Sequence, residues 1–316
     1  MKKKKIKNPL IRRIPRELLG DWKKYLVVAL FLILTIGFVS GMYVANESML
    51  VAANEGVTKY KLEDGHFELD KKADETLLAA IETGTKADVK QYYLDKAKKE
   101  LDEKLDEKAY PEAYDKAWDK IVEEIDDKYA DAEEKYELND PDFTEVPVKV
   151  YENFFRNEEE DYNNDGKKDG TIRVFPQTED INLACLLKGS FPQTKDEIAI
   201  DRMHADNVGV TVGDTITISG ETYKIVGLLA YVNYSTLHEK TTDLMFDALK
   251  FDVAMVTPEG FDRLHKSVHY TYAWKYENEP EDDAQEKIQS DNFMRALLTQ
   301  VVVADNELED YTPKYG

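Results

Sequence analysis

The chain has 316 residues, a length typical of one or two domains, and 42% of them are hydrophobic. Its formal net charge is −22; residues 1–24 contribute +8 and residues 25–45 contribute nothing, so residues 46–316 carry −30. An acidic body of this kind repels nucleic acid and anionic lipid headgroups, so nucleic acid is not an expected partner. The single cysteine, Cys185, excludes a disulfide within the chain.

An uncharged apolar run over residues 25–45 predicts a transmembrane helix. At ~1.5 Å per residue a helix of this length spans about 30 Å, the thickness of a hydrocarbon core. The run is too long for the apolar part of a cleaved signal peptide, so we expect it to be retained as an anchor. The basic flank precedes the run, and the positive-inside rule therefore places residues 1–24 in the cytoplasm and residues 46–316 outside the cell membrane.

Two shorter patterns flank this span. Residues 10–19 repeat apolar side chains at helical spacing opposite three arginines, which indicates either an amphipathic helix on the inner leaflet or an ordinary basic flank. Residues 46–58 extend the helix beyond the span and are expected to end near Gly56. Next, residues 65–69 alternate as in a strand, and Asp74 is placed to cap a short helix through Ile81 that Gly84 would stop.

Residues 86–140 are rich in charge and predict a helical hairpin inserted into the exported domain. Two apolar stripes recur at helical spacing, and Pro111 divides them while Pro141 ends the second. Proline suits the first turn of a helix, so the second helix should begin at Pro111. The hairpin is either an arm that protrudes toward a partner or an insertion packed against its own domain.

The pattern changes to short strands over residues 147–260. The alternation predicts strands at 148–151, 171–175, 181–187, 197–200, 215–219, 223–229 and 253–257. Residues 213–227 give the clearest hairpin, with two alternating runs on either side of Ser219 and Gly220. Helices are expected at 202–207, 258–266 and 283–300. The exported domain is therefore predicted to be α+β, a mixed α/β domain behind one N-terminal transmembrane helix.

One loop has the spacing of a calcium site. Residues 161–170 begin D-x-N-x-D-G, which places the side-chain oxygens of Asp161, Asn163 and Asp165 along a tight turn. Lys167 would add its backbone carbonyl, and Asp169 stands at the ninth loop position. Position twelve is an isoleucine and the loop leads into a strand, so this is no EF-hand, and Glu158 to Glu160 would have to complete the site. The alternative is an Asn/Asp/Gly turn without metal.

No other segment indicates a catalytic or cofactor-binding site. The chain lacks the phosphate-binding, nucleophile-elbow and zinc-protease motifs, so we expect no catalytic residue and no bound cofactor apart from the calcium just described. His265 and His269 lie four residues apart on an expected helix and could share a metal, but no third ligand is evident. If the protein serves an ATP-driven process, another chain must bind the ATP.

Two motifs behind the span resemble the extracytoplasmic part of FtsX-like, MacB-type ABC transporter permeases. Residues 187–201 read L-K-G-S-F-P-Q-T-K-D-E-I-A-I-D, and residues 212–227 read V-G-D-T-I-T-I-S-G-E-T-Y-K-I-V-G. With the basic start, the resemblance covers about residues 10–60 and 180–260. It implies a non-catalytic permease, in a homo- or heterodimer, that works with a cytoplasmic ABC ATPase and transmits ATP-driven motion to an extracellular substrate or partner.

The chain departs from that family in its number of spans. Such permeases have four, three of them after the exported domain, whereas residues 46–316 contain no second run long enough to span. Either the chain is the N-terminal part of a longer permease or the other spans form a separate chain, and we expect the first. The alternative is a membrane-anchored adhesin or sensor with a single span, which would bind its partner through the helical arm.

Overall fold

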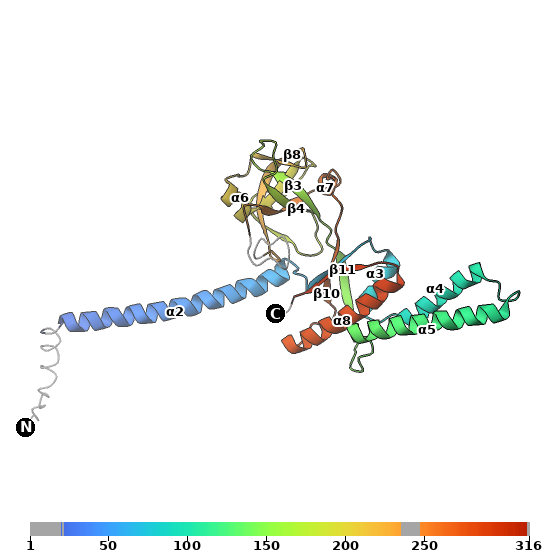
Figure 1. Ribbon diagram of the computed structural model, residues 1–316. Coiled ribbons are helices and arrows are strands. Elements are labelled where there is room, and N and C mark those ends of the chain that lie inside the picture. Colours follow the sequence, from blue (N-terminus) through green and yellow to red (C-terminus); the bar gives the residue numbers. More distant parts are fainter. Residues whose placement is uncertain (1–19, 21, 235–246, 315–316) are drawn as a thin grey trace, which may run out of the picture. The chain divides into compact units, whose positions relative to one another are not determined.

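The computed structural model describes residues 20, 22–234 and 247–314 (Figure 1). The chain divides into two compact units, Met1–Lys59 and Tyr60–Gly316. The predicted amphipathic segment at 10–19 lies outside the described residues.

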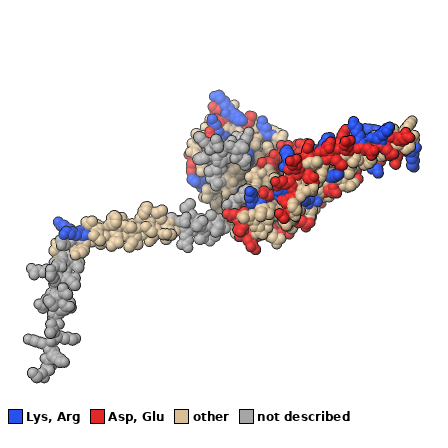
Figure 2. Space-filling model, turned by 60° about the horizontal axis from the view of Figure 1, so that its bottom comes forward, with Lys and Arg blue, Asp and Glu red and all other residues tan. Residues whose placement is uncertain are grey.

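In the part of the first unit that the structure describes, one continuous helix, α2 (Trp22–Lys59), has 38 residues. Its segment Trp22–Val44 has a mean hydropathy of 2.4 and none of its window is buried, so by length and composition it is able to cross a membrane. Figure 2 shows this stretch without blue or red atoms beyond the lysines at its start. The predicted span and its helical continuation are both present, and the helix ends at Lys59 instead of near Gly56.

The second unit contains a four-stranded antiparallel sheet in the order β11-β1-β10-β2. Its strands are β1 (Gly65–Leu69), β2 (Val148–Glu152), β10 (Tyr270–Tyr276) and β11 (Leu308–Pro313). Helices α3 (Glu75–Glu82) and α8 (Asp283–Val303) pack on it over a core that includes Phe67, Trp274 and Phe293. We call the sheet with these helices the sheet lobe.

The predicted stop and start signals of α3 are confirmed. The Asp74 carboxylate accepts the Leu77 N–H at 2.8 Å, as a helix N-cap does. After the helix, Gly84 has φ 66°, and a Cβ at this position would lie 2.0 Å from the carbonyl oxygen of Val146. Only glycine therefore fits at this turn, where the chain passes close to the backbone of the segment that leads into β2.

The helical hairpin is formed by α4 (Val89–Lys104) and α5 (Pro111–Tyr136), which lie side by side (Figure 1). Its base contacts α8: the Thr299 hydroxyl oxygen accepts the Ala87 N–H at 2.9 Å, and Lys96 pairs with Asp305 at 2.6 Å. Figure 2 shows acidic and basic side chains intermixed along its length. The hairpin is therefore packed on its own domain at the base and extends as an arm beyond it.

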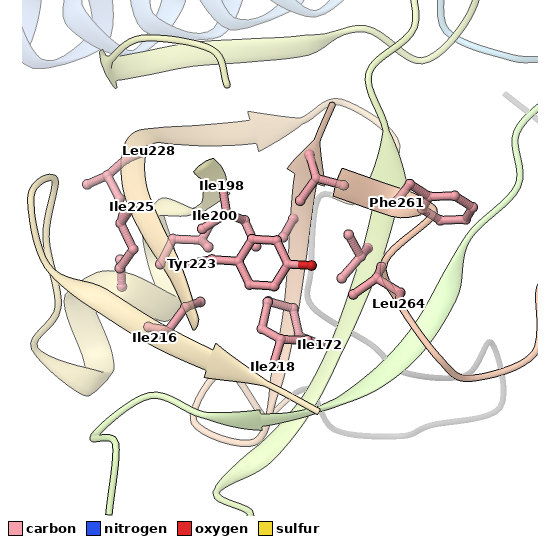
Figure 3. Packing of buried hydrophobic residues seen from close by; sticks show 14 residues of the cluster. Ile172, Ile198, Ile200, Ile216, Ile218, Tyr223, Ile225, Leu228, Phe261 and Leu264 are labelled. Atoms are coloured by element: carbon pink, nitrogen blue, oxygen red, sulfur yellow. The ribbon is translucent and has the colours of Figure 1, made fainter. Parts of the chain in front are cut away.

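A seven-stranded sheet in the order β5-β8-β6-β9-β4-β3-β7 forms the rest of the unit. Because β7 also pairs with β8, the sheet closes on itself, and we call this part with its two helices the barrel lobe. Ten of its buried residues are labelled in Figure 3, where Ile172, Ile216 and Ile218 surround the Tyr223 ring. The elements are β3 (Arg156–Asp161), β4 (Gly170–Pro176), β5 (Ala184–Gly189), β6 (Glu197–Asp201), α6 (Arg202–Val208), β7 (Thr215–Ile218), β8 (Glu221–Tyr231), β9 (Phe251–Val256) and α7 (Pro258–Phe261).

The barrel lobe is inserted between β2 and β10, two strands that pair with each other in the sheet lobe. Its two connections meet at an isolated antiparallel bridge between Phe155 and His269, whose rings stack with centroids 4.5 Å apart. The His269 Nδ1 also lies 2.7 Å from a Glu68 carboxylate oxygen on β1. The chain therefore enters and leaves the barrel lobe at one narrow neck.

Several predicted bounds need correction. The helix expected at 258–266 ends at Phe261. The Thr257 hydroxyl caps its start, but the helix has a single turn, after which the chain continues toward the neck. The strand expected at 181–187 begins at Ala184. Three strands were not predicted, β3, β10 and β11. Acidic side chains fill β3, so it shows no apolar alternation. In β10 aromatic side chains do alternate with Thr271, Ala273 and Lys275, and the sequence analysis missed this signal.

Candidate functional site

The five residues after α2, Tyr60–Asp64, form a linker that contacts the barrel lobe. The Tyr60 carbonyl accepts the Leu183 N–H at 2.8 Å, and the Lys61 carbonyl accepts the Asn182 N–H at 3.0 Å. The Lys61 ammonium donates to the Glu179 carbonyl at 2.6 Å. The linker therefore pairs by its backbone with the segment that leads into β5.

Glu63 is the centre of this linker and is buried to 3% exposure. Its carboxylate accepts hydrogen bonds from His66 Nδ1 at 3.0 Å and Asn182 Nδ2 at 2.5 Å, and its Oε1 lies 3.2 Å from the Lys314 ammonium. Its backbone N–H donates to the Asn182 side chain at 3.1 Å. One carboxylate thus joins the barrel lobe, the start of β1 and the end of β11.

The pKa values in this cluster follow from its charges. Burial alone would raise the pKa of Glu63, but the hydrogen bond and charge of His66, with the charge of Lys314, lower it to about 2. Burial alone would lower the pKa of His66, but the hydrogen bond and charge of Glu63 raise it. At neutral pH Glu63 is therefore an ionised carboxylate held by His66, Asn182 and the Lys314 ammonium.

The linker also contacts the sheet lobe and the described end of the chain. The Asp64 N–H donates to the Trp274 carbonyl at 2.9 Å, and the Asp64 carboxylate lies 3.0 Å from the Lys275 ammonium. The Lys314 N–H donates to the Asp64 carbonyl at 2.9 Å, and Gly65 stands opposite Pro313 in the β1–β11 register. The first and last described strands of the second unit, β1 and β11, are therefore antiparallel neighbours.

The predicted calcium loop begins at the last residue of β3 and ends at β4. The Asp161 carboxylate accepts the N–H groups of Asp165 at 3.1 Å and Gly166 at 2.8 Å. The Asn163 side-chain oxygen also accepts the Asp165 N–H, at 2.9 Å. These bonds hold the turn by its own backbone, so the loop is pre-shaped without an ion.

The later loop residues lie on the same turn. Asp165 accepts the Lys167 N–H at 2.9 Å and lies 3.4 Å from the Lys167 ammonium, while Asp169 accepts from the Asn163 amide at 3.2 Å. Glu158, considered as a completing ligand, instead accepts the backbone N–H groups of His265 and Lys266. Calcium binding by this loop stays a prediction.

His265 and His269 do not share a helix, contrary to the expectation from their spacing. The helix ends at Phe261; His265 is exposed, and His269 forms the bridge at the neck. The expected one-turn geometry for a shared metal is therefore absent.

A groove of about 530 Å³ lies between the arm and α8. Its lining is mostly apolar and aromatic and comes from all three helices: Val89, Tyr93, Ala97, Ile125, Tyr129, Ala132, Tyr136, Leu138, Leu298 and Val302 are among its residues. The apolar stripes predicted along residues 86–140 thus face one another and α8. They serve the packing of the arm at its base.

No protein-family model matches the chain, and no curated protein matches it. Among solved structures, the periplasmic region of MacB from Actinobacillus actinomycetemcomitans matches at 10% identity and a TM-score of 0.29, covering 55% of this chain and 75% of that one. The extracellular domain of the noncanonic ABC-type transporter YknZ from Gram-positive bacteria matches at 14% identity and a TM-score of 0.30, covering 56% and 88%. These neighbours are extracytoplasmic domains, the kind of domain that the sequence motifs indicate.

The sequence analysis missed the linker and its cluster. Glu63, Asn182 and Lys314 are far apart in the chain and are ordinary polar residues in their local patterns. The one local signal is His66, three residues after Glu63 at the start of a predicted strand. The spacing of Glu63 and His66 does not by itself predict that Glu63 is buried.

Proposed function

We propose that this chain is the N-terminal part of an FtsX/MacB-like ABC transporter permease whose exported domain transmits ATP-driven motion to an extracellular substrate or partner. In this proposal residues 1–24 are cytoplasmic, α2 is the first span, and a separate ABC ATPase binds the permease dimer inside the cell. The permease itself is non-catalytic. The motifs at 187–201 and 212–227 support the assignment to this class.

The adjacent ends of the second unit are the observation that carries the proposal. The Lys314 N–H donates to the Asp64 carbonyl, so a segment that follows residue 314 starts beside the segment that joins α2. A domain whose ends lie together is suited to insertion between two consecutive elements, here two membrane helices. A single-span adhesin or sensor has no need of this arrangement, and for this reason we favour the permease.

The continuity of α2 supports transmission of motion. Its helical hydrogen bonds run without interruption from the apolar segment to Lys59, the residue before the linker. The linker then bonds to both lobes, through Asn182 on one side and Trp274 on the other. A displacement of the helix would therefore be passed to both lobes through the backbone and Glu63.

The experiment uses the full-length gene product with its ATPase. Co-purification of an ABC ATPase subunit is the first expected result, and its absence would contradict the proposal. In that complex, spin labels on cysteines introduced at the exposed residues Lys195 and Glu279, in a Cys185→Ser background, report the distance between the lobes. We expect the distance distribution to change between nucleotide-free and ATP-bound states.

Asn54→Pro tests whether α2 transmits motion from the ATPase to the exported domain. Proline in a helix interior removes a hydrogen bond and costs about 3 kcal/mol, so α2 would bend between the span and Lys59. The ATP-dependent change in distance should disappear, while ATPase binding remains. Asn54→Ala is the matched control and should behave as the unmodified protein.

The loop at 161–170 is proposed as a calcium site of the exported domain. Isothermal titration of the full chain with CaCl₂ should give one binding event that Asp165→Asn weakens, since the loop would lose a ligand. Absence of heat at millimolar calcium would show that the loop is an Asx turn alone.

A further inference from the structure

A second group of buried ionisable side chains lies inside the barrel lobe. Glu160 on β3, His204 on α6 and Asp252 on β9 each place a ligand atom within 4.8 Å of the others. Their exposed fractions are 1%, 0% and 0%. Over residues 20, 22–234 and 247–314 this is the only group of three His, Cys, Asp or Glu side chains that converge in this way.

The histidine is oriented as a metal ligand would be. His204 Nδ1 lies 2.8 Å from the Ala248 carbonyl, so Nδ1 carries the proton and donates it there. The lone pair of neutral imidazole is then on Nε2, which lies 3.2 Å from Glu160 Oε1. A backbone carbonyl that fixes the tautomer in this way is the usual outer partner of a histidine bound to a metal.

Asp252 is fixed in the same manner. Its Oδ1 accepts the Val253 N–H at 2.7 Å and the Asp201 N–H at 3.2 Å, while its Oδ2 has no hydrogen-bond partner. Asp201 in turn caps α6 by accepting the Met203 N–H at 2.7 Å, which positions the helix turn that carries His204. The backbone therefore holds both side chains in place before any ligand arrives.

The remaining polar atoms of the group are unsatisfied although they are buried. Both carboxylate oxygens of Glu160, Oδ2 of Asp252 and Nε2 of His204 lack a hydrogen bond; the 3.2 Å approach of Nε2 to Glu160 does not have hydrogen-bond geometry. Buried polar groups without partners are rare in proteins because their desolvation is not compensated. Three residues that each bring one ligand atom within 4.8 Å of the others, and that include these unsatisfied atoms, indicate a ligand that accepts electron pairs.

A surface cleft adjoins the group at Glu160. Glu160 and Asp161 line a surface cleft of about 340 Å³ together with the calcium-loop residues Gly166 and Lys167 and the β7–β8 turn at Ser219. Glu160 therefore belongs both to the lining of the cleft and to the buried group.

We propose that Glu160, His204 and Asp252 bind one divalent transition-metal ion, for which zinc is the test probe. One imidazole nitrogen and two carboxylates are a donor set that suits zinc and its first-row neighbours, with a fourth position left for water or a second carboxylate oxygen. The ion would connect β3, α6 and β9 and so brace the barrel lobe. This site is distinct from the proposed calcium loop and does not depend on the permease function.

A proton is the competing occupant. Burial alone would lower the pKa of His204, but the charges of Asp252 and Glu160 raise it to about 9. Burial also raises the pKa of Asp252 well above its usual range. Both shifts favour the protonated forms of His204 and Asp252, so the experiment must separate a bound metal from a bound proton.

The experiment titrates the full chain in detergent, stripped with EDTA, with ZnCl₂ against a chromophoric chelator. We expect one zinc per chain by elemental analysis and a higher Tm with zinc than without it. Glu160→Gln and His204→Gln should each weaken zinc binding by at least about tenfold, since loss even of an outer partner costs about 10–100-fold. His265→Gln, at an exposed histidine, is the matched control and should leave affinity and Tm shift unchanged.

Two results would overturn the proposal. Zinc that neither binds stoichiometrically nor raises Tm would show that the group holds a proton only. Zinc binding that stays intact in both variants would place the ion elsewhere. If circular dichroism shows that His204→Gln does not fold, Asp252→Asn replaces it, because its isosteric amide keeps Oδ1 as an acceptor for Val253 and Asp201. The ATPase co-purification is unaffected by either outcome.

Discussion

The Glu63 cluster and the Glu160 group each place a buried glutamate beside a histidine, but they differ in how the carboxylate is satisfied. Glu63 accepts hydrogen bonds from His66 and Asn182 and lies against a lysine. Glu160 has only the 3.2 Å approach of His204 and no hydrogen bond. A glutamate beside a histidine therefore links the two lobes at Glu63, whereas at Glu160 the same pair of residue types leaves atoms that are available to bind a ligand.

The largest expected effect comes from Glu63→Gln. The amide loses the attraction of His66 and Lys314 and leaves buried partners unmatched, so the free energy of unfolding should fall by about 3 kcal/mol. Urea unfolding of the full chain in detergent measures this loss. Glu152→Gln, in an exposed pair with Lys72, is the control and should cost less than about 1 kcal/mol. Equal losses at both positions would contradict the role given to Glu63.

Acid should reproduce that loss in the unmodified chain. The pKa of Glu63 is lowered from 4.5 to about 2, so its contribution is present above pH 4.5 and disappears as the pH falls toward 2. The shift corresponds to about 3 kcal/mol. The difference in unfolding free energy between the unmodified chain and Glu63→Gln should therefore shrink over this window. A difference independent of pH would mean that Glu63 acts through packing.

The same Glu→Gln change at Glu160 should have a much smaller effect in the metal-free chain. Glu160 has no hydrogen bond to lose, and removal of its charge removes a cost of burial together with the attraction of His204, so the free energy of unfolding should fall by at most about 1 kcal/mol. Urea unfolding in EDTA measures it. A loss as large as that of Glu63→Gln would show that the two groups are alike and that Glu160 is a fastening residue too.

The smallest effect is expected at an exposed pair that joins the arm to α8. Lys96 lies 2.6 Å from Asp305, but both side chains are about half exposed or more. Solvent screens such pairs, so Lys96→Ala should change the unfolding free energy by less than about 0.5 kcal/mol. A double-mutant cycle with Asp305→Ala isolates the pair. A coupling above about 1 kcal/mol would make the charges, rather than the apolar groove, responsible for holding the arm.

Elements with a clear local pattern were predicted well. The apolar run, the cap at Asp74, the start of α5 at Pro111 and the alternation around Ser219 each correspond to an observed element. The α+β class is confirmed because it was inferred from elements with such local patterns. Predictions failed where charged side chains hid a strand, as in β3, where an alternating strand was overlooked, as in β10, and where one capped turn was taken for a longer helix, as at Pro258.

The sequence by itself determined the membrane helix, the charged arm, the α+β class and the shape of the loop at 161–170, because each depends on neighbours within a few turns or one hairpin. Only the tertiary structure brought Glu63 to Asn182 and Lys314, and Glu160 to His204 and Asp252. These contacts join residues more than forty positions apart through closure of the barrel and insertion of one lobe into the other. Single polar residues carry no periodic signal, so their burial is decided by the fold that surrounds them.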